Sequence, residues 1–411
     1  MIEENETIRA LFQKEFSKMV AVISWRFGLP HMEIAEDIVG ETFLLAIQNW
    51  EINGIPPNPT GWLYKSAQRK TLYHFKRAKI LEQKILPELS LTKEGGYMMP
   101  ELDFTRENIK DSQLRMLFAI CNPAIASEAQ IGLALRILCG FGVDEIAEAF
   151  LSNKETINKR LFRAKEKLRA EKVKMELPPE SEIEERLDNV LHLIYLLFNE
   201  GYYSKTQNQI LRRELCLDAL RLGKMLTEYG MTNRPKTNAL LALMCFHASR
   251  FSARQTENNS FILYENQDKD LWDDKLIDLG SQFLALSAHG DEISSYHLEA
   301  RIASWHCRKE DTTEKWQNIL HLYDSLLLIN YSPSAALNRT FALYKAKGIN
   351  AALAEMKKLK LENNHFYFIL LGELYKQIDV EKAKFNYQIA IELSLTKTEK
   401  QILQAKIDSL V

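Results

Sequence analysis

The sequence predicts an all-α protein, and three observations lead to this prediction. Apolar residues recur at helical spacing along most of the 411 residues. Residues 140–172 have the pattern of two helices separated by a tight break. Near the end of the chain, helical segments form pairs that repeat one another. A chain organised in this way buries its apolar faces by packing helix on helix.

Composition sets limits on the function. The chain is 46% hydrophobic, which is enough for two or three globular domains. Its formal net charge is −2, so any affinity for nucleic acid requires bases gathered in one region. The five cysteines lack metal-ligand spacing and predict free, buried thiols in a reducing compartment. Because no signal peptide or long apolar stretch is present, we expect a soluble, cytoplasmic protein with no membrane partner.

The sequence contains no pattern typical of catalysis. A Gly-rich phosphate loop, a nucleophile elbow and an HExxH pattern are all missing from it. The nine histidines form no metal-binding pairs with nearby carboxylates. We therefore expect a protein that is not an enzyme and that binds neither a metal nor a cofactor.

Residues 1–80 predict a first domain of three or four helices. In the helix at 35–50, apolar residues such as Ile38 and Phe43 face inward. Three acids are left largely outward, namely Glu36, Asp37 and Glu41. This face is either solvated or a docking surface for a basic partner, and the spacing alone favours a solvated face.

The helix that follows Thr60 interleaves aromatic and basic side chains. Aromatic rings offer stacking surfaces for unpaired bases, and Lys and Arg follow the nucleic-acid backbone. The alternative is that Trp62 belongs to the core. The candidate contacts to single-stranded nucleic acid are Trp62, Lys65, Arg69, Lys70, Tyr73, Lys76 and Arg77.

Residues 81–112 predict a linker, and residues 113–177 predict a second domain. Ser152, followed three residues later by Glu155, predicts the capping box of its last helix. One face of that helix is apolar, at Ile157, Leu161, Ala164 and Leu168. Between residues 154 and 174, nine bases against three acids leave a surplus of six positive charges.

This pattern favours a helix-turn-helix over an ordinary charged hairpin. In a helix-turn-helix the second helix enters the major groove of duplex DNA, where polar side chains meet base edges and bases neutralise phosphates. The candidate DNA contacts are Lys154, Thr156, Asn158, Lys159, Arg160 and Arg163.

Pro178-Pro179 predicts a domain boundary, followed by a helical domain at 178–411. Its repeat resembles the tetratricopeptide pattern at Leu371, Gly372, Tyr375, Ala383, Tyr387 and Ala390. One segment of this domain is a candidate regulatory segment, formed by Asn199, Glu200, Gly201 and Tyr202. Asn199 and Glu200 either cap or bridge helices or bind a ligand, and the spacing favours the structural role.

Taken together, these segments resemble a bacterial extracytoplasmic-function sigma factor. Residues 35–50 and 59–77 resemble its region two, and residues 140–169 resemble the helix-turn-helix of its region four. Residues 121–151 and four segments after residue 190 resemble the subgroup with a long, tetratricopeptide-like C-terminal extension. The resemblance covers nearly the whole chain.

The resemblance implies an RNA polymerase sigma factor. The acidic helix with Glu36, Asp37 and Glu41 would dock on core RNA polymerase, in place of the solvated face that spacing alone favours. The helix after Thr60 would melt and read the promoter element nearest the start site. The basic helix would read the upstream element of promoter DNA as a duplex. The C-terminal domain would regulate these steps, through contacts with the first two domains or with a signalling protein.

Two alternatives remain at this stage. A repeat-based adaptor would use its N-terminal helices to bind a protein partner, without binding core polymerase. A conventional repressor would bind duplex DNA tightly in the absence of polymerase.

Overall fold

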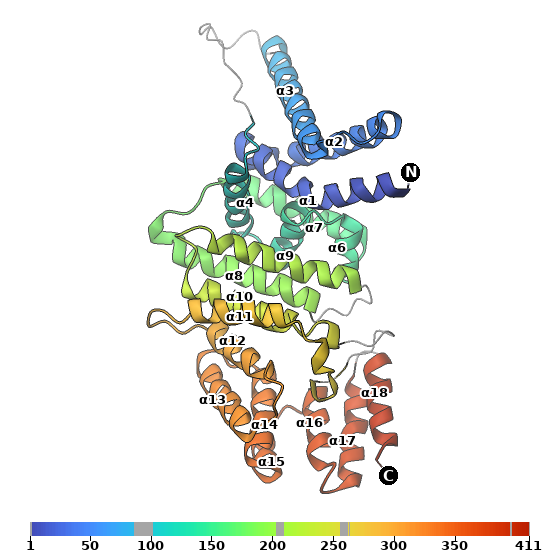
Figure 1. Cartoon of the computed structure of the whole chain (residues 1–411), viewed down its shortest axis with the longest axis vertical. Coiled ribbons are helices and arrows are strands. Elements are labelled where there is room, and N and C mark those ends of the chain that lie inside the picture. Colours follow the sequence, from blue (N-terminus) through green and yellow to red (C-terminus); the bar gives the residue numbers. More distant parts are fainter. Residues whose placement is uncertain are drawn as a thin grey trace. The chain divides into compact units, whose positions relative to one another are not determined.

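The computed structural model describes residues 2–85, 102–202, 209–254, 262, 264–394 and 397–410, and every regular element in these ranges is a helix. The prediction of an all-α protein is confirmed (Figure 1). The chain forms two compact units, Met1–Thr232 and Asn233–Val411. None of the helices in the described ranges is long and apolar enough to cross a membrane.

The first unit begins with three long helices, α1 (Ile2–Phe27), α2 (Met32–Asn53) and α3 (Pro59–Ile85), with a 3-10 turn, η1 (Leu29–His31), after α1. Buried residues of α1 such as Phe16 and Met19 share the core with Phe43 and Trp50 of α2. Gly28, at a φ of 92°, ends α1, because the left-handed region favours a residue without a side chain. Trp62 of α3 packs edge-on against Trp50, with ring centroids 5.4 Å apart.

The next helices of this unit are α4 (Arg106–Ile120), α5 (Ser127–Leu133), a π-helical turn η2 (Ala134–Leu138), α6 (Val143–Ala149) and α7 (Lys154–Ala170). Thr105 caps α4 by accepting a hydrogen bond from the backbone N–H of Asn108. Since α3 runs to Ile85 and α4 begins at Arg106, helices occupy both ends of the stretch 81–112 that was predicted as a linker. Residues 86–101 of that stretch lie outside the described residues.

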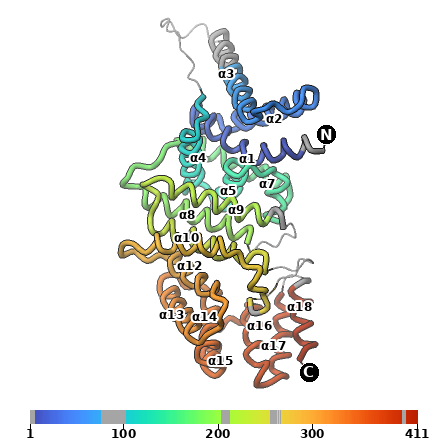
Figure 2. Tube along the Cα trace, in the orientation of Figure 1, coloured from blue at the N-terminus to red at the C-terminus, as the bar shows by residue number. Residues whose placement is uncertain are grey.

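Two further helices, α8 (Glu180–Tyr202) and α9 (Gln209–Thr227), complete the first unit (Figure 2). Arg186 of α8 donates to the carbonyl oxygen of Phe118 at 2.8 Å, and Arg221 of α9 donates to that of Leu138 at 2.6 Å. Both carbonyls lie in the domain predicted at 113–177. The compact unit therefore extends to residue 232, beyond the boundary that the sequence predicts at 178.

Gly201 allows α8 and α9 to cross closely. A Cβ atom at this position would lie 2.6 Å from the carbonyl oxygen of Arg212 and 2.8 Å from the sulfur of Cys216. The buried guanidinium of Arg212 donates to the carbonyl oxygens of Gly201 and Tyr202, each at 3.0 Å. These bonds satisfy two carbonyls at the end of α8.

The second unit is made of α10 (Pro235–Ala248), three 3-10 turns η3 (Ser252–Arg254), η4 (Tyr264–Asn266) and η5 (Lys269–Leu271), and then α11 (Asp274–Leu286), α12 (Ser295–His306), α13 (Thr313–Ile329), α14 (Pro333–Lys347), α15 (Ile349–Leu359), α16 (His365–Tyr375), α17 (Val380–Leu393) and α18 (Lys397–Asp408). Tyr387 of α17 packs against Gly372 of α16, where a Cβ atom would lie 2.5 Å from the tyrosine ring. Ala383 and Ala390 are buried in the same cluster. The repeat positions therefore pack α16 and α17 together, and their assignment to a tetratricopeptide array stays a prediction.

Candidate nucleic-acid interface

The turn between α6 and α7 is fixed by backbone and side-chain hydrogen bonds. Leu151 has a φ of 48°, and the backbone N–H of Ser152 donates to the carbonyl oxygen of Ala147 at 2.8 Å. The side chain of Asn153 accepts from the backbone N–H of Thr156 at 2.8 Å and caps α7. The prediction that Ser152 is the cap is wrong by one residue, because the left-handed Leu151 lengthens the turn.

Helix α7 separates its apolar and polar faces as the sequence predicts. The four residues Ile157, Leu161, Ala164 and Leu168 are buried. The side chains that were predicted to contact DNA are exposed, with Arg160 half-buried, at Lys154, Thr156, Asn158, Lys159, Arg160 and Arg163. Because the apolar face anchors the helix, its polar face can approach a ligand without unfolding the unit.

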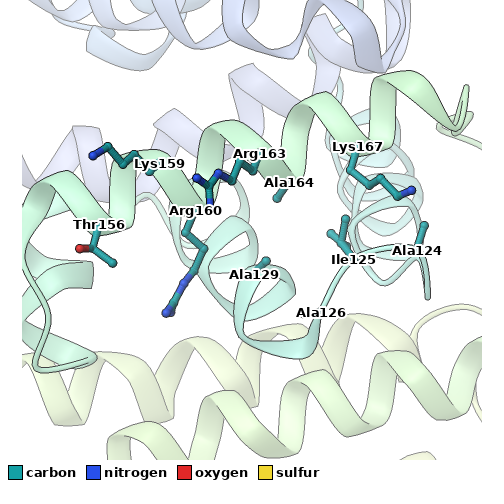
Figure 3. A pocket seen from close by; sticks show the side chains of 10 residues that line it. All are labelled: Ala124, Ile125, Ala126, Ala129, Thr156, Lys159, Arg160, Arg163, Ala164 and Lys167. Atoms are coloured by element: carbon teal, nitrogen blue, oxygen red, sulfur yellow. The ribbon is translucent and has the colours of Figure 1, made fainter.

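A groove of about 570 Å³ lies along this polar face (Figure 3). One side carries bases of α7, and the other side is built from small and apolar side chains of residues 124–129. The bases that line it are Lys159, Arg160, Arg163 and Lys167. The groove thus places four bases beside small and apolar side chains. Such concentrated positive charge suits the phosphates of a nucleic acid.

The counter-ions of these bases are weakly held. Lys159 pairs with Glu155 at 2.6 Å, and Lys167 pairs with Glu171 at 2.8 Å. Each of these four side chains is about half exposed or more. Arg160 pairs with Glu128 of α5 at 3.0 Å and lies over the ring of Phe150. Exposed pairs such as the two lysine pairs contribute at most about 1 kcal/mol each, so phosphates can replace their carboxylates.

The opposite side of α7 contacts the acidic helix α2. The Glu36 carboxylate is 9% exposed, and it pairs with Arg136 of η2 at 2.9 Å and with Lys165 of α7. Arg169 donates to the carbonyl oxygen of Pro30 at 3.0 Å and lies 3.6 Å from the Glu33 carboxylate. The prediction that Glu36 points outward is wrong, because two cations from distant parts of the chain neutralise it.

The other two predicted acids of α2 are exposed. Burial raises the pKa of Asp37, and the negative charges of Glu36, Glu33 and Glu41 raise it further. Glu41 forms an ion pair with Lys70 of α3 at 2.8 Å. Beyond these acids the exposed face continues with apolar side chains, among them Leu44, which is 59% exposed. The face therefore combines the exposed carboxylates of Asp37 and Glu41 with apolar surface.

Helix α3 exposes part of its predicted single-strand surface. Lys65, Arg69 and Tyr73 are exposed, and Tyr73 has 69% of its surface accessible. Trp62 is half-buried against Trp50, which agrees with the alternative that it belongs to the core. Lys70 is half-buried and engaged by Glu41. The side chains of Lys76 and Arg77 lie outside the described residues.

The candidate regulatory segment lies at the crossing of α8 and α9. Gly201 and Tyr202 are buried, and the Tyr202 ring stacks on Phe198. Asn199 and Glu200 are half-buried. Burial raises the pKa of Glu200, and the nearby charge of Glu128 raises it further. Gly201 and Tyr202 therefore pack within the first unit, whereas the choice between a structural and a ligand-binding role for Asn199 and Glu200 stays a prediction.

Three charged residues that the sequence did not single out complete the site. Arg136 of η2 pairs with Glu36 of α2, Glu33 of α2 lies beside Arg169 of α7, and Glu128 of α5 pairs with Arg160 of α7. Arg136 is 100 residues from Glu36, and Lys165 is 129 residues from it. No local pattern in the sequence can indicate partners at such separations.

Comparison with known proteins adds a relationship over most of the chain. Residues 186–288 match a family of unknown function, DUF6596. The chain is 31% identical over 386 residues to "Uncharacterized protein R00370" of Rhizobium meliloti (strain 1021), a match that covers 92% of this chain and 90% of that protein. No solved structure matches the chain. The DUF6596 match begins in α8 and ends beyond α11, so it includes parts of both compact units.

Proposed function

This chain belongs to the same family as the Rhizobium meliloti protein, and we propose that it is an RNA polymerase sigma factor of the extracytoplasmic-function type. In this proposal it acts in the cytoplasm and binds core RNA polymerase. It directs the polymerase to a bipartite promoter and promotes melting of the DNA for initiation. Its own residues catalyse no reaction.

The observation that carries the proposal is the exposed basic face of α7 beside an open groove. Thr156, Asn158, Lys159 and Arg163 are exposed on a helix whose opposite face is buried and whose N-terminus is capped. Polar side chains near the start of such a helix can meet base edges in a major groove, while Lys and Arg meet phosphates.

The surfaces of α2 and α3 support the other two steps. On α2, Asp37 and Glu41 form an acidic surface next to exposed apolar side chains, which suits a basic partner such as a helix of core polymerase. On α3, Lys65, Arg69 and Tyr73 offer charge and a stacking ring to a melted strand. The C-terminal helices would then regulate how these surfaces are presented.

Binding and transcription assays test the proposal. The full chain should bind core RNA polymerase in size-exclusion chromatography and should produce discrete transcripts from genomic DNA of its own organism. The start sites of these transcripts identify the promoters. A failure to bind core polymerase would favour the adaptor, and tight duplex binding without polymerase would favour the repressor.

The double substitution Lys159→Ala and Arg163→Ala tests the recognition helix. Each lost phosphate contact should lower the salt dependence of promoter binding by about one unit, so the double variant should lose about two units. The measurement is promoter affinity of the holoenzyme at several salt concentrations. Lys224→Ala, which removes an exposed base of α9, is the matched control and should leave the slope unchanged. Equal slopes in all three proteins would contradict the assignment of α7.

A further inference from the structure

Glu36 joins helices that are far apart in the sequence. One carboxylate oxygen accepts from the Nε of Arg136 at 2.9 Å, and the other pairs with the Nζ of Lys165. The side chain of Lys165 is 14% exposed and that of Glu36 is 9% exposed. Charges that are buried to this extent are stable only while they stay paired. Separation of α7 from α2 therefore requires another cation beside Glu36 and another anion, or water, beside Lys165.

Arg169 extends this contact along the same side of α7. Its guanidinium donates to the carbonyl oxygen of Pro30 and approaches the Glu33 carboxylate. The bases of the DNA-facing groove lie on a different side of α7 and make none of these contacts. The acids of α2 thus supply the ion pairs that join α2 to α7.

Those acids also belong to the exposed face of α2. Glu33, Asp37 and Glu41 follow one another at intervals of four residues and share one side of the helix. Besides burial, the charges of Glu33 and Glu41 raise the pKa of Asp37, and the charge of Lys165 lowers it. A basic surface that docks on Asp37 and Glu41 would therefore also be within reach of Glu33, and it would lie next to Glu36, whose charge acts on Asp37.

We propose that Glu36 is the centre of an ionic latch that holds α2 and α7 in a closed arrangement, and that a basic partner surface opens it by replacing Lys165 and Arg169 as counter-ions. The inference rests on the proposed function, because that function makes the partner core polymerase and the released helix the reader of the upstream element. Docking on α2 and release of α7 are then one event. The free factor keeps α7 close to α2 until polymerase arrives.

Distances between α2 and α7 in the full-length chain test the latch. Spin labels on Gln48→Cys and Ala170→Cys, both exposed positions, report the separation of the two helices by double electron–electron resonance. The five native cysteines are buried and leave the introduced thiols as the reactive ones. The free chain should give one short distance, and addition of core polymerase should add a longer one.

Two substitutions should open the latch without polymerase. Glu36→Gln removes the charge between Arg136 and Lys165. Lys165→Met removes the α7 cation that pairs with Glu36, while the Glu36–Arg136 pair remains. Both should show the longer distance in the free chain. Glu171→Gln is the matched control, because it removes a carboxylate that pairs with Lys167 within α7, and it should keep the short distance. If Glu36→Gln does not fold, as judged by circular dichroism, Lys165→Met decides.

The outcomes separate the latch from the proposed function. Folded variants that keep the short distance would overturn the latch. Polymerase that binds without lengthening the distance would overturn its opening by a partner, while the sigma-factor proposal would stand. If polymerase does not bind, the proposed function falls, and the distances in the free variants still decide whether Glu36 holds α7.

Discussion

At the scale of single residues, the buried polar groups of the second unit show how burial controls protonation. His306 lies between the rings of Tyr264 and Trp316, at centroid distances of 4.9 and 5.7 Å. Burial, together with the charges of Arg250 and Lys315, lowers the pKa of His306 to about 3. The ammonium of Lys315 donates to the Tyr264 hydroxyl at 2.9 Å. Protonation of His306 would therefore add a third cation beside Arg250 and Lys315.

This arrangement predicts that the second unit loses stability in acid. The unfolded histidine has a pKa near 6.5, so below that pH the unfolded chain binds a proton that the folded chain refuses until about pH 3. The contribution of His306 should fall as the pH drops from 6.5 towards 3, by about 2 kcal/mol between pH 7 and pH 5 at about 1.4 kcal/mol per pKa unit. His247 should add a loss of the same sign, because burial lowers its pKa as well. Urea unfolding at several pH values measures this loss.

Substitution isolates the contribution of His306. The variant His306→Gln should show a shallower dependence of unfolding free energy on pH over this range. His289→Gln, at an exposed loop position, is the control and should keep the dependence of the natural chain. The same slope in both variants would show that His306 is not the titrating group.

Glu36 and its neighbours show what the sequence can reveal about a side chain. Helical spacing correctly predicts that Asp37 and Glu41 are exposed. It fails for Glu36, because Arg136 and Lys165 reach it only after the chain has folded. Trp62 is a similar case, since its contact with Trp50 depends on how α2 and α3 cross. Local pattern predicts the face of a helix, whereas tertiary partners decide which polar residues of that face are buried.

At the scale of elements, α7 was largely predictable because its periodicity is a local property. The four apolar positions from Ile157 to Leu168 are buried as expected. Its start was predicted less well. Leu151 adopts a left-handed conformation that no residue preference indicates, since such conformations favour glycine. The cap therefore moves to Asn153.

The cap can be tested by a pair of neighbouring substitutions. Asn153→Ala removes the oxygen that accepts from the backbone N–H of Thr156 and should cost about 1 kcal/mol of unfolding free energy. Ser152→Ala should cost much less, because Ser152 contributes its backbone N–H to the turn. Chemical unfolding of both variants gives the comparison. A larger loss for Ser152→Ala would restore the capping box that the sequence predicts.

At the scale of the whole molecule, the first compact unit includes α8 and α9. A pair of prolines is a strong local signal for a break, and the chain does break between α7 and α8. Arg186 of α8 and Arg221 of α9 nevertheless donate hydrogen bonds to the carbonyl oxygens of Phe118 and Leu138, which lie before the break. A break in secondary structure is visible in the sequence, whereas packing across the break is not. The predicted boundary at 178 therefore falls inside a compact unit.

Truncation tests the extent of this unit. A chain of residues 1–232 should be monomeric in size-exclusion chromatography and should unfold cooperatively. A chain of residues 1–177 lacks the partners of the α4 and η2 surfaces and exposes apolar side chains that α8 and α9 cover, so it should aggregate or lose helix content. A folded, monomeric 1–177 chain would contradict the unit boundary at 232.

The five buried cysteines have a consequence for how opening of the chain can be followed. Burial raises the pKa of every cysteine thiol for which a shift is resolved, to about 12 at Cys245, so in the folded state these thiols stay protonated and react slowly. Cys121, Cys139 and Cys216 belong to the first unit, and Cys245 and Cys307 to the second. Each thiol becomes reactive only when its surroundings open. The rates at which an alkylating reagent modifies the two groups therefore report the opening free energy of each unit separately, in the natural chain and under native conditions.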